Sequence, residues 1–379
     1  MLKRLRLVLG SIILAVIIPL APQSAVAMAP VAPQTATNQS QGSISITSTS
    51  VQPSFPLTIK FNIVALGTSN IVDARLHYRI ERTSFAQVTS EAIAKITPSK
   101  SINSSYTLDL RYIGGVPTGT KIVYWWTLKD TDNNVTQSAT ASFSFEDTKY
   151  AWQSITQGLV TLKWYQGNNQ FAQTLMTTAQ QALVKLAADT GAQLKKPVTI
   201  YIYNGSADLQ GAMVFPREWT GGVAFTDFNI ITIGVSTDNL AWGTGAVIHE
   251  LTHLVTNQMT NNPYSGIPVW LNEGLSMYAE GPLDSTFVTV FSLAVLSKSL
   301  ISVRTLDSPF SADSTKAYIS YAESYYLVKF LVDRYGQSKL SSLLTTFAQG
   351  STYDNAFKTV YGFDIAGLNT LWQNSVYGK

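Results

Sequence analysis

The 379-residue chain has no cysteine, only three histidines, and few charged residues, 13% of the total. The absence of cysteine excludes disulfide bonds and any metal or catalytic site that depends on a thiolate. The 26 basic and 23 acidic residues form no basic cluster, so the sequence lacks the electrostatic footprint of a nucleic-acid-binding protein. We therefore expect no nucleic-acid partner. We also expect the hydrophobic cores to be stable without covalent cross-links.

Beyond its N-terminus the sequence also lacks an apolar run long enough to cross a membrane. The N-terminus combines a basic start (residues 3–6), the apolar run Leu7–Leu20 and small residues at 25–27. This order is typical of a secretory signal peptide over residues 1–27, and the apolar run is shorter than the about 20 residues of a transmembrane helix. We expect a secreted or cell-surface protein with no stable membrane span after cleavage. A retained anchor and an association with the cell envelope stay open.

Residues 28–43 are rich in Pro, Ala, Gln, Ser and Thr without a hydrophobic period, which indicates a flexible linker. Residues 44–147 show the alternation of β-strands; between Ile71 and Ile80, for example, Val72 and every second residue after it are apolar. Seven such segments within about 100 residues favour an all-β sandwich of the immunoglobulin or fibronectin type III kind. The predicted strands are residues 45–51, 57–65, 71–80, 91–96, 106–112, 121–130 and 138–145.

The positions of three aromatic residues in this region can be predicted from the strand pattern. His77 falls on the polar face of its predicted strand, so we expect it at the surface. Trp125 and Trp126 are neighbours on one strand and must point to opposite faces. One of them belongs to the core, and an exposed one could serve binding.

The other two histidines lie in the apolar segment Val247–Val255, V-I-H-E-L-T-H-L-V. On a helix, His249 and His253 are one turn apart, so both imidazoles project from the same face and can hold one zinc ion. Glu250 lies beside the first histidine, where its carboxylate can take a proton from an attacking water. The alternative is a core helix that merely carries two histidines. Their position on either side of a glutamate, in a chain so poor in histidine, argues against it.

A catalytic zinc site needs a third protein ligand. A thiolate is excluded because cysteine is absent, and the third histidine, His77, lies far upstream. A carboxylate remains. Glu273 lies in a second apolar helical pattern, Val269–Tyr278, at 273 − 253 = 20 residues after His253. We predict a Zn²⁺ ion held by His249, His253 and Glu273.

The two segments together, H-E-x-x-H (249–253) and W-L-N-E-G (270–274), resemble the gluzincin clan of zinc metallopeptidases. The resemblance is greatest to bacterial peptidase MA-like domains and more distant to aminopeptidases with the same Asn-Glu-Gly signature, in which the glutamate comes one residue earlier. It covers about Tyr150–Lys379. It implies an α+β, thermolysin-like catalytic lobe followed by a helical lobe, the three zinc ligands just predicted, and Glu250 as the general base.

The hydrophobic period changes after residue 147, which sets the expected limits of the peptidase domain at 148–379. Strands at 159–164 and 198–203, a helix that ends near Gly191, and a hairpin at 221–234 predict a mixed sheet packed on the histidine helix. In gluzincins the strand before that helix forms the edge of the substrate cleft, and Gly221–Ala224 matches it in position. An ordinary hairpin strand is the alternative. Further helices are predicted at residues 285–300, 314–335, 338–349, 353–361 and 365–375.

Tyr318, Tyr321 and Tyr325 share one face of the predicted helix 314–335. An aromatic stripe at helical spacing usually belongs to a core. By the resemblance, however, Tyr321 stands where related aminopeptidases carry a tyrosine that stabilises the oxyanion of the reaction. We therefore assign Tyr321 to catalysis, with Tyr318 as the reserve.

These features predict a secreted zinc-dependent peptidase that acts on peptide or protein substrates. The Gly-x-Met-Glu-Asn stretch with which aminopeptidases bind a free N-terminus is not visible before His249, so an endopeptidase is favoured. The alternative is a catalytically inactive cell-surface protein that binds its partner through the β-sandwich and a pseudo-peptidase lobe. Hydrolysis of a non-peptide bond at the same zinc is a third reading. The sequence does not identify the substrate.

Overall fold

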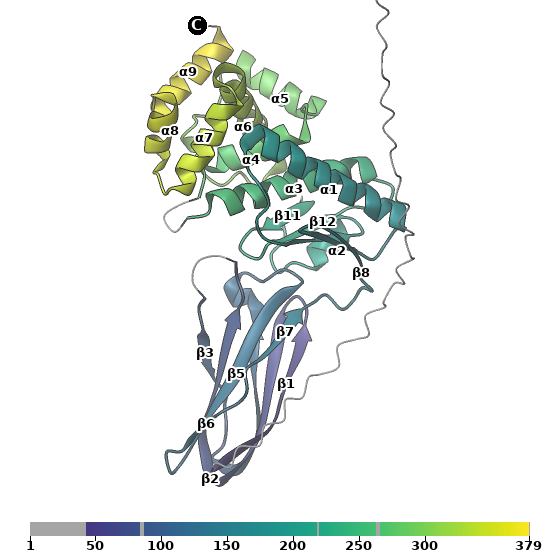
Figure 1. Cartoon of the computed structure of the whole chain (residues 1–379), viewed down its shortest axis with the longest axis vertical. Coiled ribbons are helices and arrows are strands. Elements are labelled where there is room, and N and C mark those ends of the chain that lie inside the picture. The colour runs from purple at the N-terminus through teal and green to yellow at the C-terminus, as the bar shows by residue number, and fades with distance from the viewer. Residues whose placement is uncertain (1–42, 84–86, 218–219, 263–265, 379) are drawn as a thin grey trace, which may run out of the picture. The chain divides into compact units, whose positions relative to one another are not determined.

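The computed structural model describes residues 43–378 except 84–86, 218–219 and 263–265. All described residues belong to one compact unit, Pro33–Lys379 (Figure 1). The predicted signal peptide, 1–27, and almost all of the predicted linker lie outside the described residues. Among the helices that the structure describes, none combines the length and the apolar character that a bilayer span requires.

The N-terminal part is a β-rich region (residues 44–145) built around one long strand, β2. The first half of β2 pairs with β1 and β4, and its second half pairs with β3 and β5, all antiparallel. Strands β6 and β7 then pair with β5. The strands are β1 (Ile44–Ser54), β2 (Thr58–Ile80), β3 (Ser90–Ile93), β4 (Ser99–Asp109), β5 (Thr120–Asp130), β6 (Val135–Gln137) and β7 (Ala141–Phe145). The expected immunoglobulin or fibronectin kinship of this region stays a prediction.

Several details of the predicted strands were wrong; among them, the predicted strand 91–96 ends at Ile93 and the predicted strand 138–145 begins at Ala141. The segments 57–65 and 71–80 form a single strand, because β2 continues across an irregular register between Leu66 and Ile71. Val72 is 38% exposed and Ile71 is buried in its place, because a β-bulge between Ile71 and Asp73 reverses the faces. The predicted strand 106–112 begins earlier, at Ser99, and ends at Asp109. The Asp109 carboxylate accepts a hydrogen bond from the Arg111 N–H at the start of a 3₁₀ turn.

The three aromatic residues of this region divide between core and surface. Trp126 is fully buried, which confirms that one of the two tryptophans belongs to the core. The ring of Trp125 stacks on the His77 imidazole, with centroids 5.3 Å apart and planes 9° from parallel. The His77 side chain is 18% exposed. The predicted surface histidine is therefore largely covered by its neighbour.

The second sheet has five strands in the order β11-β12-β10-β9-β8. Strands β12, β10 and β9 are parallel, whereas β11 and β8 at the two ends are antiparallel to their neighbours. The mixed sheet and the β11–β12 hairpin were predicted; β8 and the short helix α2 (Ser206–Gly211) were not. The strands are β8 (Gln153–Gln157), β9 (Val160–Trp164), β10 (Val198–Tyr203), β11 (Gly222–Phe225) and β12 (Ile230–Gly234).

Helices α1 (Asn169–Thr190) and α3 (Leu240–Thr260) lie against one face of this sheet (Figure 1). Ile200 and Ile202 of β10 point into that core, which contains the apolar faces of both helices. Because side chains alternate along a strand, Tyr201 and Tyr203 point to the opposite face. There they form a second cluster together with Trp152 and Phe228.

The rest of the chain is helical and shares a third core. Residues of α4, including Trp270, Leu271 and Leu275, are buried in it together with residues of α6 to α9. The predicted helix 285–300 ends earlier, at Leu296, and the other predicted helices agree with the structure within two residues at each end. The helices are α4 (Val269–Glu280), α5 (Ser285–Leu296), α6 (Ser314–Tyr335), α7 (Gln337–Ala348), α8 (Tyr353–Tyr361) and α9 (Ile365–Tyr377).

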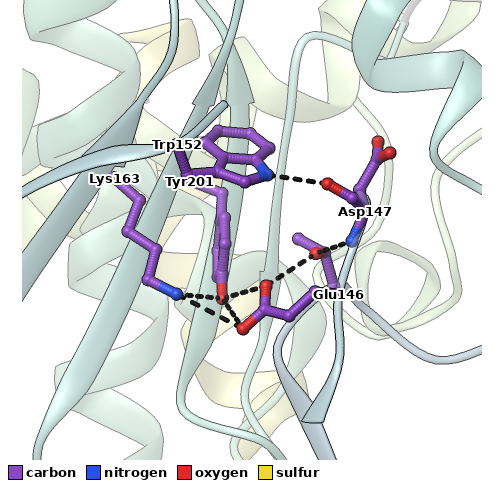
Figure 2. A network of polar contacts seen from close by, with 6 residues as sticks. Glu146, Asp147, Trp152, Lys163 and Tyr201 are labelled. Atoms are coloured by element: carbon purple, nitrogen blue, oxygen red, sulfur yellow. Dashed lines mark hydrogen bonds and ion pairs between the residues drawn. The ribbon is translucent and has the colours of Figure 1, made fainter. Parts of the chain in front are cut away.

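The tyrosine face of the second sheet meets the end of the β-rich region in a polar network (Figure 2). The Tyr201 hydroxyl donates to the Glu146 carboxylate at 3.1 Å, and the Lys163 ammonium lies 3.3 Å from the same carboxylate. The Trp152 N–H donates to the Asp147 carbonyl at 2.9 Å. Burial, and then the charge of Glu146, raise the pKa of Tyr201, so this phenol stays protonated and keeps its hydrogen. The expected domain limits, 44–147 and 148–379, stay predictions.

Candidate active site

Helix α3 presents both of its histidines to one cleft. Its apolar residues Val247, Leu251 and Leu254 are fully buried against the sheet, which fixes the rotation of the helix about its axis. The rings of His249 and His253 therefore lie side by side, with centroids 4.7 Å apart and planes at 82°. This is the arrangement expected for two imidazoles one helical turn apart.

Helix α4 brings Glu273 against both imidazoles. Its Oε2 atom lies 3.4 Å from Nε2 of His249 and 3.4 Å from Nε2 of His253. Both distances exceed the normal N–H···O hydrogen bond of about 2.9 Å. Among the described residues, this buried oxygen has no hydrogen-bond partner.

The two distances from Glu273 Oε2 to the imidazole nitrogens fit a tetrahedral metal ion. Ligands at about 2.0–2.1 Å from Zn²⁺ lie about 3.3–3.4 Å from one another in a tetrahedron. A single group of three ligand atoms within 4.8 Å of one another was found in the described part of the chain, and it consists of His249, His253 and Glu273. Two nitrogen ligands and one carboxylate are a donor set that zinc accepts. The residues therefore fit the predicted ion.

The charges of the site favour a cation between these side chains. Burial disfavours a charged imidazole, but the carboxylates of Glu273 and Glu280 outweigh it and raise the pKa of His249 well above its ordinary value. Burial likewise opposes the Glu273 carboxylate, and the two histidines outweigh it and lower the pKa of Glu273. In the absence of metal, the two histidines thus bind protons more readily than free imidazoles do. Zinc and protons compete for the same nitrogens.

Each imidazole is oriented by a second residue of α4. Nδ1 of His249 lies 2.7 Å from Oε1 of Glu280, and Nδ1 of His253 lies 3.1 Å from the Ser276 hydroxyl. With Nδ1 donating its proton, Nε2 carries the free lone pair that a metal needs. Neither of these two partners was predicted from the sequence. Their spacing was a usable signal, because residues 273, 276 and 280 recur on one face of a helix.

Glu250 lies between α3 and the edge strand β11. It is buried, which raises the pKa of its carboxyl group, while the two histidines and the N–H of Ala224 act in the opposite direction. The strand passes very close: a Cβ atom on Gly222 would lie 2.7 Å from Oε1 of Glu250. Glycine at this position therefore allows the strand to approach the carboxylate.

Tyr321 of α6 reaches the cleft because α6 packs closely on α4. At Gly274 a Cβ atom would lie 2.3 Å from the Ser324 carbonyl oxygen, so the glycine of the W-L-N-E-G motif permits this contact. Burial, and then the charges of Glu273 and Glu250, raise the pKa of Tyr321, so its hydroxyl keeps its proton. Tyr318 also lines the cleft and is more exposed. Tyr325 packs on Tyr278 away from the cleft.

These residues line a cleft of about 770 Å³. Beyond the polar centre, its walls carry large apolar side chains from several elements, among them Phe215, Trp242 and Phe287. Residues 222–224 of β11 line it as well, and β11 is the last strand of its sheet among the described residues. The predicted match of Gly221–Ala224 to a cleft-edge strand agrees with this position.

The C-terminal half of the chain matches a known family. The family model of the peptidase MA superfamily matches residues 178–378, which is more than half of the chain and includes both motifs. The chain belongs to the peptidase MA superfamily. This membership supports a metal-dependent peptidase as the general activity class, with zinc as the expected metal. No curated protein matched the sequence.

The solved structures that this peptidase MA protein matches are only distantly similar to it. Yeast LTA4 hydrolase in complex with bestatin is 12% identical, with a TM-score of 0.40 over 84% of this chain and 65% of that chain. An M1 zinc metallopeptidase from Deinococcus radiodurans is 11% identical, with a TM-score of 0.35 over 85% of this chain and 90% of that chain. OgpA from Akkermansia muciniphila is 8% identical, with a TM-score of 0.22 over 29% of each chain. The chain thus spans less than a third of the length of OgpA.

Proposed function

We propose that this protein is an exported zinc-dependent endopeptidase. One observation carries the proposal: Nε2 of His249 and Nε2 of His253 each lie 3.4 Å from Oε2 of Glu273, as the ligands of a tetrahedral ion would. This oxygen is buried and has no hydrogen-bond partner within the described part of the chain. Glu250 follows the first of these ligands directly in the sequence and is buried in the same cleft. A scaffold that only binds a partner has no need of a carboxylic base beside three metal ligands.

His249, His253 and Glu273 would hold the ion, and the other residues would handle protons and charge. Zinc, when bound, supplies a Lewis acid that lowers the pKa of water and polarises the scissile carbonyl. The Glu250 carboxylate accepts a proton from the attacking water and delivers it to the leaving amine. Its raised pKa suits both steps, because the group must bind the proton and release it again.

Tyr321 and β11 would complete the site. The Tyr321 hydroxyl keeps its proton and lies in the cleft, so it can donate to the oxyanion that forms during reaction. The backbone of β11 would hold an extended peptide by adding it to the sheet as a further strand. Strand β11 lines the cleft and is the last strand of its sheet among the described residues, and an extended chain paired to such an edge favours internal cleavage, which is why we propose an endopeptidase.

The test is to measure zinc content and proteolysis on the same preparation of the purified, secreted protein. We expect about one zinc per chain, turnover of casein or of an extended peptide, loss of turnover with a chelator, and recovery with added zinc. Stoichiometric zinc with no turnover of any peptide would favour a binding protein or another hydrolase. Full zinc occupancy in His253→Ala would show that the ligands are misassigned.

A further inference from the structure

Two walls enclose the cleft, and they are held in different ways. The helix wall consists of α3, α4 and α6, in which α4 packs on both of the other two helices. The strand wall consists of β11 and the segment Met213–Arg217. Strand β11 has only four residues and pairs with β12 alone among the described residues. Its position therefore depends on its neighbours outside the sheet, in particular at the turn 226–229 that joins it to β12.

The turn between β11 and β12 is held by the β-rich region. The Thr83 N–H donates to the Asp227 carbonyl at 2.6 Å, and the Thr83 hydroxyl donates to the same oxygen at 3.0 Å. The Lys196 ammonium in turn donates to the Thr83 carbonyl at 3.1 Å. Thr83 thus connects the β-rich region to the turn of the cleft-edge hairpin and to the segment before β10.

Side chains add to this connection. The Arg82 guanidinium lies 3.6 Å from the Asp227 carboxylate and 5.5 Å from the centre of the Phe228 ring. The ion pair is solvent-exposed, so it contributes little. Phe228 matters more, because it packs against both the core of the β-rich region and the cluster around Tyr201 and Tyr203. The hydrogen bonds of Thr83 and the burial of Phe228 therefore fix the turn.

The β-rich region also contacts the other part of the strand wall. A Cβ atom on Gly115 would lie 2.7 Å from the Val214 side chain, so the backbone of the β-rich region touches this segment directly. Val214 lies between Met213 and Phe215, which both line the cleft. Both parts of the strand wall are thus supported by residues more than 80 positions away in the sequence.

We propose that Thr83 is a positioning residue: it holds β11 where the strand can pair with an extended substrate. The proposal rests on the proposed function and adds a task for the β-rich region. The predicted metal ligands all lie on α3 and α4, so loss of the Thr83 contacts displaces the strand wall and leaves these ligands in place. The Michaelis constant for an extended peptide then rises about threefold to tenfold, in keeping with the loss of single hydrogen bonds, and kcat changes less.

The experiment compares Thr83→Val, which removes the hydroxyl, with Thr83→Pro, which removes the N–H, and with Thr83→Ser, which keeps both donors. Thr47→Val is the matched control, because the Thr47 hydroxyl also donates to a backbone carbonyl within the β-rich region, at 3.1 Å from the Val64 oxygen. For each variant, kcat, KM, zinc content, melting temperature and amide hydrogen exchange of residues 222–234 are measured.

We expect faster amide exchange in β11 and a higher KM in Thr83→Val and Thr83→Pro, with zinc content unchanged. Thr83→Ser and Thr47→Val should behave as the wild type does. Wild-type exchange and KM in both Thr83→Val and Thr83→Pro would overturn the proposal, as would an equal effect of Thr47→Val. Faster exchange in β11 together with a wild type that cleaves no peptide would keep the positioning role and refute the proposed function instead.

Discussion

The two walls of the cleft differ in the sequence separation of the residues whose contacts hold them in place. In the helix wall, the two histidines, their partners Ser276 and Glu280, and the third predicted ligand all lie within residues 249–280. In the strand wall, the hydrogen bond from the Thr83 hydroxyl to Asp227 joins residues 144 positions apart. The predicted metal centre is encoded locally, whereas the shape of the cleft depends on a separate part of the chain.

Because of this difference, we expect variants in the two walls to affect different properties of the enzyme. Variants in the helix wall should change metal content or kcat, because they alter groups that bind the ion or move charge. Variants in the strand wall should mainly change substrate binding, because they move the edge against which a peptide lies. A helix-wall variant that raised KM alone would contradict this division of effects between the two walls. The predictions below begin with the largest expected effect.

The largest effects should come from the two glutamates of the helix wall, and they should differ in kind. Glu250→Gln removes the proton acceptor and should lower kcat by about 10²–10⁴ with zinc retained, because Glu250 is not one of the predicted ligands. Glu273→Gln weakens a ligand and should lose activity together with zinc. Elemental analysis and kinetics on both variants measure this. Equal zinc loss in both variants would contradict the division of roles.

Tyr321→Phe should have the next largest effect. Removal of a donor to the developing oxyanion is expected to lower kcat by about 10²–10³ with little change in KM or zinc content. Tyr318→Phe is the matched control, because Tyr318 lines the same cleft one helical turn away. Steady-state kinetics of the two variants decide between them. Near-wild-type turnover in Tyr321→Phe would remove Tyr321 from the mechanism, and a selective loss in Tyr318→Phe would transfer the role to that residue.

The residues that orient the histidines should have smaller effects. Glu280→Gln and Ser276→Ala should each weaken zinc binding about 10- to 100-fold, as is usual when a partner of a ligating histidine is lost. Glu280→Gln should be the more severe, because it removes a charged acceptor at 2.7 Å and Ser276→Ala removes a neutral hydroxyl at 3.1 Å. Competition with a zinc chelator at fixed pH measures both affinities. A larger loss of zinc affinity in Ser276→Ala than in Glu280→Gln would show that the charge of the partner does not govern how the histidines are oriented.

Features that depend on short stretches of sequence were predicted, and features that depend on contacts between distant segments were not. The helix α6, the strand β10 and the ligand spacing of α3 depend on periods of a few residues, so they are visible in the sequence. The pair Ser276 and Glu280 could have been found by the same reasoning, since both lie on the face of α4 that carries Glu273.

Other features could not be predicted, because they depend on contacts between distant segments. The bulge that exposes Val72 and the continuity of β2 depend on which strands flank it. The short helix α2 and the strand β8 have weak local patterns and are stabilised by the sheet. The contact of Thr83 with Asp227 leaves no trace in either local sequence.

The positions of Phe228 and Phe55 bear on the cooperativity of unfolding. Each packs against both the core of the β-rich region and the tyrosine cluster of the second sheet. When side chains are shared between two cores, neither core can lose its packing without exposing apolar surface of the other. The free energy that opposes local opening near the edge strand therefore includes part of the stability of the β-rich region. Heating or denaturant should act on the two regions as one transition, and the cleft would lose its shape in that same step.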